Sequence, residues 1–234
     1  MSENPSYGHK RIAIALKFNK KRILRIMKKY NLKPYRRRLQ KPQKLDDKNK
    51  PEALYPNVLK NLCPITPHVV WVSDFTYISF EGRFIYLATV MDVFTRMIVG
   101  WSVLNNHAVM LVKEAFEDAI QKTKKVPQIL HSDQGSEYDS KEYTELLKSH
   151  KITISMSKKA APWENGFQES FYSGFKLDLG NPNRFETLGE LVEEIYLTIN
   201  YYNKTRIHTE LKMSPYQYFL NYQNKLINTL ELVS

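Results

Sequence analysis

The sequence predicts an α/β fold in which a mixed five-stranded sheet with flanking helices follows a small basic helical arm. Three observations support this prediction. Segments rich in β-branched and aromatic residues first follow one another across short turns and then alternate with helical segments. The N-terminal residues are helical and strongly basic, and a proline-containing stretch separates them from the remainder of the chain.

The strands and helices of the main domain are predicted in chain order from these patterns. Residues 69–80 form a strand, and Glu81-Gly82 turns the chain into the next strand. Three antiparallel strands are followed by alternating helices and strands, which is the order of a ribonuclease H-like mixed sheet. The predicted strands cover 69–80, 83–94, 97–103, 128–132 and 152–156, and the predicted helices cover 107–122, 140–150, 163–179 and 188–203.

Residues 19–32 of the arm have the pattern of an amphipathic basic helix, with apolar side chains at helical spacing from Ile23 through Ile26 and Met27 to Tyr30. A shorter helical pattern at 10–17 precedes it, so the arm is expected to resemble a helix-turn-helix. The basic residues expected to contact DNA lie on the second helix and in the extended segment after Pro34: Arg22, Arg25, Lys29, Arg36, Arg37 and Arg38.

Length and composition limit the class of protein. The chain has 234 residues, of which 42% are hydrophobic, so it can bury a substantial core. No apolar run approaches the roughly 18 residues that a membrane span requires, and we therefore expect a cytoplasmic protein that does not enter a membrane. The single cysteine, Cys63, is expected to be a buried thiol. The predicted domains are a basic helical arm at 1–45, a Pro-rich linker at 46–66, a catalytic core at 67–222 and a C-terminal tail at 223–234.

The positive charge of the chain is concentrated in the arm. Residues 1–50 contain 17 of the 35 basic side chains and 3 of the 24 acidic ones, whereas residues 51–234 contain 18 and 21. Such an asymmetry indicates a polyanionic partner, because each phosphate that Lys or Arg neutralises releases condensed counterions. The alternative is a charged face that serves only solubility.

Two aspartates lie where a sheet would present carboxylates to a cleft. Asp74 shares one face of its predicted strand with apolar side chains, where a lone charge is costly to bury, and no Lys or Arg occurs between residues 69 and 82. A bound cation would compensate that charge. Asp133, in HSDQGSEY, directly follows the predicted strand at 128–132, and its alternative role is to begin a turn before Gly135.

A third carboxylate belongs to the predicted helix at 163–179. Phe167, Phe171 and Phe175 form an apolar stripe, and we place Asn165, Glu169, Tyr172 and Lys176 on the opposite, working face. An ordinary solvated glutamate is the alternative for Glu169. Its position weakens that alternative, because 35 residues lie between it and Asp133 and Lys176 follows two helical turns later.

Six motifs occur in order between residues 69 and 219: WVSDFTYI, YLATVMDVFTRMIVGW, HSDQGSEY, SMSKK, ENGFQESFYSGFK and YYNKTRIHTELKMSPYQY. In this order they resemble the insertion-sequence DDE transposases with a retroviral-integrase-like core, specifically those whose catalytic half is encoded by a second reading frame. The arm also resembles that family's helix-turn-helix segment. Carried over position by position, the resemblance implies that Asp74, Asp133 and Glu169 are the catalytic metal ligands and that Lys176 is the basic residue that follows them.

The chain departs from the family at a loop that often ends in Asp-Asn. Residues 160–165 read AAPWEN here, which makes Glu164 a competitor for the third ligand position. We favour Glu169, because only 30 residues lie between Asp133 and Glu164, and Glu164 stands near a helix start, where a negative charge is favoured by the helix dipole. Asp92 is a further acid on the second strand, which we interpret as structural.

The resemblance implies an enzyme, a polynucleotidyl transferase that cleaves and joins DNA strands during transposition, with functions in DNA integration and recombination. Three carboxylates suit hard cations, so two Mg²⁺ ions are expected, with Mn²⁺ as a substitute. The expected contacts to the DNA backbone near the metals are Lys176, His131, Lys158 and Lys159. His131 has an alternative role as a hydrogen-bonded histidine at a strand end.

The partners that follow are DNA, as element ends and target, further copies of the chain on that DNA, and the product of an upstream reading frame. Two other functions remain open from the sequence. One is a non-catalytic DNA-binding remnant, against which the three retained carboxylates argue, and the other is a general nuclease of the same fold.

Overall fold

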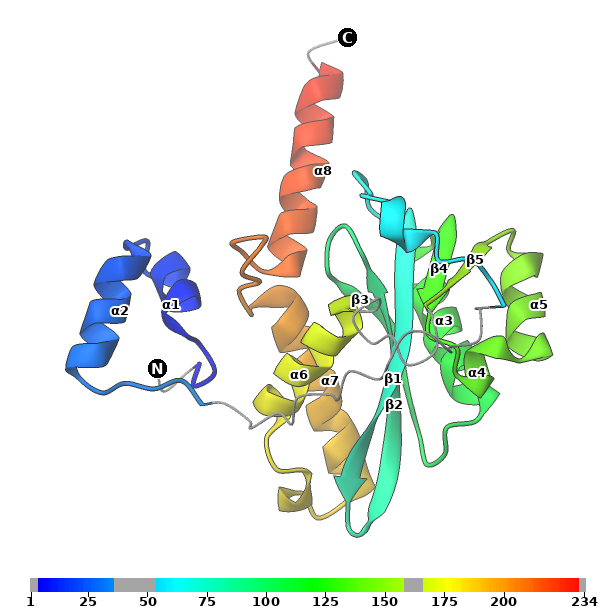
Figure 1. Ribbon diagram of the computed structural model, residues 1–234, viewed down its shortest axis with the longest axis horizontal. Helices are drawn as coiled ribbons and strands as arrows, with labels where there is room; N and C mark the ends of the chain where they lie inside the picture. Colours follow the sequence, from blue (N-terminus) through cyan, green and yellow to red (C-terminus); the bar gives the residue numbers. More distant parts are fainter. Residues whose placement is uncertain (1–3, 36–53, 158–165, 232–234) are drawn as a thin grey trace, which may run out of the picture. The chain divides into compact units, whose positions relative to one another are not determined.

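The computed structural model describes residues 4–35, 54–157 and 166–231. The chain divides into two compact units, of which the first comprises Met1–Lys41, Gly174–Gly180 and Glu193–Ser234, and the second comprises Pro42–Ser173 and Asn181–Val192. Within the described ranges no helix has the length and apolar character needed to cross a membrane. Figure 1 shows the sheet of the second unit and the helices of both.

A mixed five-stranded sheet forms the second unit, with the strand order β3-β2-β1-β4-β5. β1 pairs antiparallel with β2, and β2 with β3, whereas β4 runs parallel to both β1 and β5. The fold predicted from the sequence is therefore confirmed. The strands are β1 (Val70–Phe80), β2 (Arg83–Asp92), β3 (Ile98–Leu104), β4 (Ile129–Ser132) and β5 (Thr153–Met156).

The hairpin between β1 and β2 is closed by the turn that the sequence indicates. Glu81 and Gly82 both have positive φ, at 48° and 76°, the backbone conformation of the two-residue turns that match the twist of a hairpin. The ten residue pairs of β1 and β2 then follow in unbroken register from Phe80 opposite Arg83 to Trp71 opposite Asp92.

The apolar core of this unit lies between one face of the sheet and three helices: α3 (Val109–Thr123), α4 (Ser136–Asp139) and α5 (Lys141–Ser149). Trp71, Phe116 and Tyr143 are among its largest fully buried side chains. α3 approaches β3 closely at Gly100, where an added Cβ would lie 2.4 Å from the carbonyl oxygen of Ala115. Any larger residue at position 100 would therefore push α3 away from the sheet.

Helices dominate the first unit. It contains α1 (His9–Ala15), α2 (Lys20–Lys29) and α8 (Pro215–Glu231), together with the C-terminal parts of α6 (Gly166–Leu179) and α7 (Leu188–Lys204). Two short 3₁₀ helices, at Leu59–Asn61 and Pro182–Arg184, belong to the second unit. α8 was not predicted from the sequence, and it runs across position 222, where the predicted core ends.

The two arm helices are present, but their shared core is small. Asn19 caps α2 by accepting a hydrogen bond from the Lys21 N–H (2.8 Å). Ile23 and Met27 are buried with Ala13, whereas Ile26 and Tyr30 of the predicted apolar stripe are exposed. Two short helices can cover only one edge of that stripe.

Polar contacts tie the arm to the chain just beyond α7 within the first unit. The Ile207 N–H donates to the Tyr7 hydroxyl (2.8 Å), and the Arg11 Nε donates to the Ile207 carbonyl (2.9 Å). Next to them, the buried Arg206 forms an ion pair with Asp178 at 2.5 Å.

One expectation from composition is wrong. Cys63 is exposed rather than buried, because it lies in the irregular chain between the 3₁₀ helix at Leu59–Asn61 and the start of β1.

Candidate functional site: a carboxylate cluster at the edge between β1 and β4

The pairing of β1 with β4 brings the first two predicted carboxylates together. The parallel register places Val72 beside His131. Asp74 and Asp133 each follow two residues later in the same direction, so they also lie beside each other. Neighbouring strands are about 4.8 Å apart, and partners in a parallel pair point to the same face. The two aspartates are therefore side by side although 58 residues lie between them in the sequence.

The surroundings of Asp74 disfavour the ionised form of its carboxylate. Its pKa is raised to about 7, mainly by burial and in addition by repulsion from Asp133 and, more weakly, from Glu169. The Phe75 N–H donates to Asp74 Oδ1 (2.8 Å) and lowers the pKa in part. Among the residues that the structure describes, no basic side chain lowers the pKa of Asp74, as its sequence surroundings predict.

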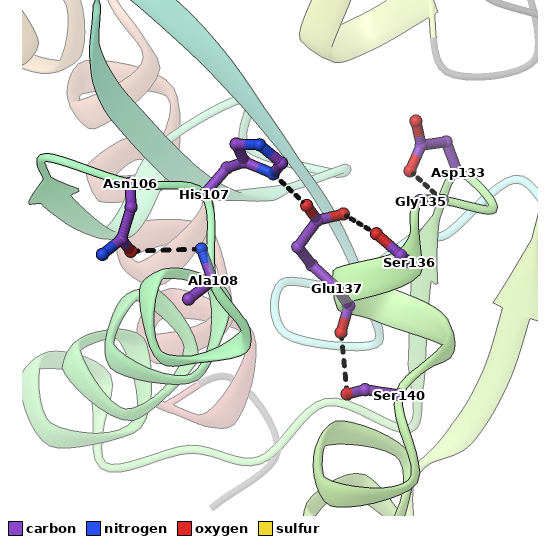
Figure 2. A network of polar contacts seen from close by, with 8 residues as sticks. All are labelled: Asn106, His107, Ala108, Asp133, Gly135, Ser136, Glu137 and Ser140. Atoms are coloured by element: carbon purple, nitrogen blue, oxygen red, sulfur yellow. Dashed lines mark hydrogen bonds and ion pairs between the residues drawn. The ribbon is translucent and has the colours of Figure 1, made fainter.

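Asp133 begins the loop between β4 and α4, and Figure 2 shows its carboxylate turned back onto that loop. The Gly135 N–H donates to Asp133 Oδ1 (2.9 Å). Burial raises the pKa of Asp133, this hydrogen bond lowers it, and repulsion from Glu137 raises it again, so the net shift is upward. The turn role that the sequence left open for Asp133 and the metal-ligand role are compatible, because only one carboxylate oxygen makes the turn bond.

Glu169 projects from α6 and is exposed, while its helical neighbours fasten the helix to the sheet. Gln168 is fully buried, and its Nε2 donates to the carbonyls of Val72 (2.8 Å) and Thr89 (3.1 Å). Tyr172 is also buried, and its hydroxyl donates to the Asp74 carbonyl at 2.5 Å. The placement of Tyr172 on the working face was therefore wrong.

Thr89 completes this attachment from β2. It lies directly opposite Asp74 in the β1–β2 register, and its hydroxyl donates to Gln168 Oε1 (3.0 Å) and hydrogen-bonds the Tyr172 hydroxyl (2.8 Å). The Arg96 guanidinium also lies over the Phe167 ring, 4.0 Å from its centroid, at the first turn of α6. The signal for this attachment was available in the sequence: two polar residues four apart, on either side of Glu169.

A second group of polar side chains adjoins Asp133 and was not predicted from the sequence. His107, between β3 and α3, pairs through Nδ1 with the buried Glu137 carboxylate, which also accepts from the Ser136 hydroxyl (3.1 Å). Figure 2 shows Glu137 between His107 and the Asp133 loop. Glu137 and His107 are 30 residues apart, so no local pattern links them.

Other predicted residues have distinct roles. Asp92 is fully buried and structural, as interpreted: its carboxylate accepts from the N–H groups of His68 (2.6 Å) and Thr95 (2.7 Å). His131 is also fully buried, and its Nδ1 hydrogen-bonds the Ser155 hydroxyl (2.9 Å), which is the alternative role left open by the sequence. A buried ring is not available to a DNA backbone, so the expected DNA contact of His131 is not supported.

The remaining candidates fall into two groups. Arg22, Arg25 and Lys29 are exposed on α2, and Lys176 is partly buried on α6. The other candidates lie outside the described residues: Arg36, Arg37, Arg38, Lys158, Lys159 and Glu164.

The donor chemistry of the cluster suits a divalent cation. Asp74 and Asp133 are adjacent oxygen donors whose pKa values are both raised, so a cation between them would relieve their repulsion. In the part of the chain that is described, no three His, Cys, Asp or Glu side chains are gathered closely enough to enclose an ion by themselves. Hard cations such as Mg²⁺ fit that arrangement, since one or two carboxylates, water and a phosphate suffice as ligands.

Comparison with known proteins finds integrase core domains and insertion-sequence transposases. Two family models, each described as an integrase core domain, match residues 65–162 and 150–215. The transposase for insertion sequence element IS904 of Lactococcus lactis is 38% identical over 172 residues, which cover 72% of this chain and 68% of that protein. The transposase for IS629 of Shigella sonnei is 30% identical over 149 residues, which cover 64% of this chain and 50% of that one.

Among solved structures, the catalytic core domain of the HTLV-2 integrase, in complex with magnesium and in a trimeric form, superposes with a TM-score of 0.55 at 19% identity. The match covers 66% of this chain and 98% of the integrase core. The catalytic core of the BIV integrase gives a TM-score of 0.52, also at 19% identity, over 68% of this chain and 99% of that one. At this identity the likeness concerns the fold.

Proposed function

The chain belongs to the family of insertion-sequence transposases with an integrase core domain, and from this premise we propose that it cleaves and joins DNA with Asp74, Asp133 and Glu169 as metal ligands. It is an enzyme of the polynucleotidyl transferase type that acts in DNA transposition by an integrase-like mechanism. The cytoplasm, where the DNA of a bacterial cell lies, is the proposed place of action.

The observation that carries the assignment of the site is the juxtaposition of Asp74 and Asp133 through the β1–β4 register. Their raised pKa values make a positive ligand favourable at that point. Glu169 would complete the set from α6, because it is near enough to Asp74 to raise its pKa. Two Mg²⁺ ions, or Mn²⁺ in their place, would supply activation of the attacking oxygen and stabilisation of the charge on the leaving oxygen.

In the proposed reaction the protein orients the reacting groups, which water and the DNA supply. In cleavage, a water oxygen attacks a phosphorus at the element end, the P–O3′ bond breaks, and a 3′-hydroxyl and a 5′-phosphate remain. In strand transfer, that 3′-hydroxyl oxygen attacks a target phosphodiester, a new P–O3′ bond forms, and the target's own O3′ leaves and takes up a proton. No covalent bond to the enzyme is needed, so the protein must only hold the phosphate beside the carboxylates.

The residues of the chain that would hold the DNA are basic. Lys176 stands two helical turns beyond Glu169 on α6, a spacing that suits a contact to the backbone of the bound strand. The exposed α2 side chains Arg22, Arg25 and Lys29 would neutralise phosphates of the bound DNA. The basic residues at 36–38 and 158–159 are proposed for the same role on charge alone.

Assembly is part of the proposal. The HTLV-2 integrase catalytic core has been solved in a trimeric form, and we propose that this chain also forms oligomers on DNA. The product of an upstream reading frame is a proposed partner. The proposed division of labour follows the arm at 1–45, the linker at 46–66, the core at 67–222 and a C-terminal segment at 223–234.

The decisive experiment tests the carboxylates separately. Asp74→Asn and Asp133→Asn should each abolish Mg²⁺-dependent cleavage and strand transfer of element-end DNA, with little loss of DNA binding, because the phosphate contacts remain. A chain that retained metal-dependent cleavage after either substitution would not use this site. Wild-type protein that binds end DNA but never cuts it with Mg²⁺ or Mn²⁺ would instead favour the non-catalytic alternative.

The third ligand requires its own comparison. Glu169→Gln should lose metal-dependent joining, whereas Glu164→Gln should keep most of it, because Glu169 is on the helix that Gln168 and Tyr172 fasten beside Asp74. The reverse result, with Glu169→Gln active and Glu164→Gln inactive, would remove Glu169 from the site.

A further inference from the structure

His107 contacts both segments that carry the paired aspartates. Its ring stacks on Phe75, with the two ring planes 8° apart and their centroids 6.1 Å apart, and it also packs on Tyr86 at 5.0 Å. On its other side Nδ1 pairs with the Glu137 carboxylate. Phe75 directly follows Asp74 in β1, and Glu137 lies in α4, directly beyond the Asp133 loop.

The Asp133 loop depends on such support. The pairing of β4 with β5 ends at Ser132, so Asp133 is the first residue beyond the ladder. The loop is compact, because a Cβ at Gly135 would lie 3.1 Å from both Asp133 Oδ1 and Glu137 Oε2. Both carboxylates therefore lie close to Gly135, and a movement of the Glu137 carboxylate would change the space around Asp133.

Charge explains why Glu137 needs His107. The side chain of Glu137 is only 7% exposed. Burial raises its pKa, but hydrogen bonds from His107, the backbone and Ser136 outweigh burial, and the pKa is lowered overall. Without the imidazole, an ionised and buried carboxylate would remain beside Asp133, which it already repels. It would turn away from Asp133 towards the cleft, and this movement would shift the loop.

We propose that His107 is a positioning residue that fixes the separation of Asp74 and Asp133 by bracing Glu137 against Phe75. The role rests on the proposed function, since it concerns the metal site of that reaction. His107 is suited to it because its side chain is 57% exposed, so it lies at the rim and not in the core. Its removal should alter the site without unfolding the unit, because the fully buried Tyr138 independently anchors α4 by its hydroxyl contact with Ser73 (3.1 Å).

The test compares variants of the full chain by Mn²⁺ titration calorimetry and by the Mg²⁺ dependence of strand transfer. His107→Phe keeps the ring on Phe75 and deletes the Glu137 pair. Its Mn²⁺ Kd and its half-saturating Mg²⁺ concentration should rise about 10-fold, as for other residues that orient metal ligands indirectly. The rate at saturating metal should stay within about threefold of the wild-type rate, since no reacting group is lost.

His150→Phe is the matched control. His150 is another exposed histidine of the same unit that packs on an aromatic ring, Phe116, at 5.6 Å. It should leave both metal readouts unchanged. Equal metal affinity in the His107→Phe and His150→Phe variants would overturn the positioning role.

A double-mutant cycle identifies the route of the effect. If His107 acts through Glu137, the variant with both His107→Phe and Glu137→Gln should bind Mn²⁺ no worse than the weaker of the two single variants. Additive losses would overturn the proposal, and so would a Glu137→Gln variant without detectable Mn²⁺ binding, because Glu137 would then itself be a ligand. Failure of the proposed function looks different: Asp74→Asn would then leave metal binding and strand transfer unchanged.

Discussion

Replacing Asp74 by Asn should stabilise the metal-free protein above neutral pH, although it abolishes the proposed activity. The Asp74 carboxyl has a pKa of about 7 in the folded chain against an ordinary value of 3.8. Between these values the folded chain binds a proton that the unfolded chain has lost, so stability falls as the pH rises from about 4 to about 7 and stays low above it. Asparagine does not ionise and escapes that loss.

The size of the effect follows from the same shift. A difference of about three pKa units corresponds to about 4 kcal/mol at 1.36 kcal/mol per unit, which is an upper limit. Asp74 keeps partial contact with solvent, which screens part of the repulsion. We therefore expect Asp74→Asn to raise the free energy of unfolding by about 2 kcal/mol at pH 8. For a chain of this length that gain raises Tm by roughly 4 to 8 °C, and the gain should vanish towards pH 4.

Urea denaturation in EDTA at pH 4.5 and pH 8 measures this directly. Asp92→Asn is the control, because the Asp92 carboxylate accepts three hydrogen bonds from His68 and Thr95, and the substitution should destabilise the chain. Mg²⁺ at pH 8 should stabilise wild-type protein and not Asp74→Asn. An Asp74→Asn variant that is no more stable than wild type at pH 8 would refute the argument.

Three further predictions concern the surroundings of the site. Tyr172→Phe should destabilise the chain by about 1 kcal/mol and weaken Mn²⁺ binding, because it deletes the hydrogen bonds of the hydroxyl to β1 and β2. Tyr143, another buried tyrosine, is the control. An equal loss of Mn²⁺ affinity in Tyr143→Phe would contradict a local role of Tyr172. Lys176→Ala should weaken binding of element-end DNA while leaving Mn²⁺ affinity unchanged, and the opposite pattern in a filter-binding and calorimetry comparison would exclude a backbone contact. Deletion of residues 1–45 should lower DNA affinity and flatten its dependence on log salt, so an unchanged slope would show that the arm does not bind phosphates.

The sheet was predictable because its signals are local. β-branched and aromatic residues indicate each strand, and Glu81-Gly82 indicates the hairpin turn. The order and the type of these elements could therefore be predicted from the sequence. α4 was not predicted, since its four residues, SEYD, are too few to show a helical period. α8 was missed because its tyrosines and asparagines, as in PYQYFLNYQN, weaken the helical pattern.

The candidate site was predictable as a list of carboxylates but not as an arrangement. Spacing and resemblance selected Asp74, Asp133 and Glu169, whereas their proximity depends on the β1–β4 register, which no single sequence specifies. The same limit explains Tyr172 and His131. A side chain that can pack or hydrogen-bond across the fold looks in the sequence like one that faces a substrate, and only burial separates the two.

The three carboxylates differ in how firmly the fold holds them, and this difference suggests where the site can be altered. Asp74 lies inside β1, where it pairs with Thr89 of β2 and both of its neighbours in the strand are paired as well. Asp133 stands one residue beyond a four-residue strand, and Glu169 belongs to a helix whose attachment depends on two side chains, Gln168 and Tyr172. Substitutions in the supporting residues should therefore change the positions of Asp133 and Glu169 relative to a fixed Asp74.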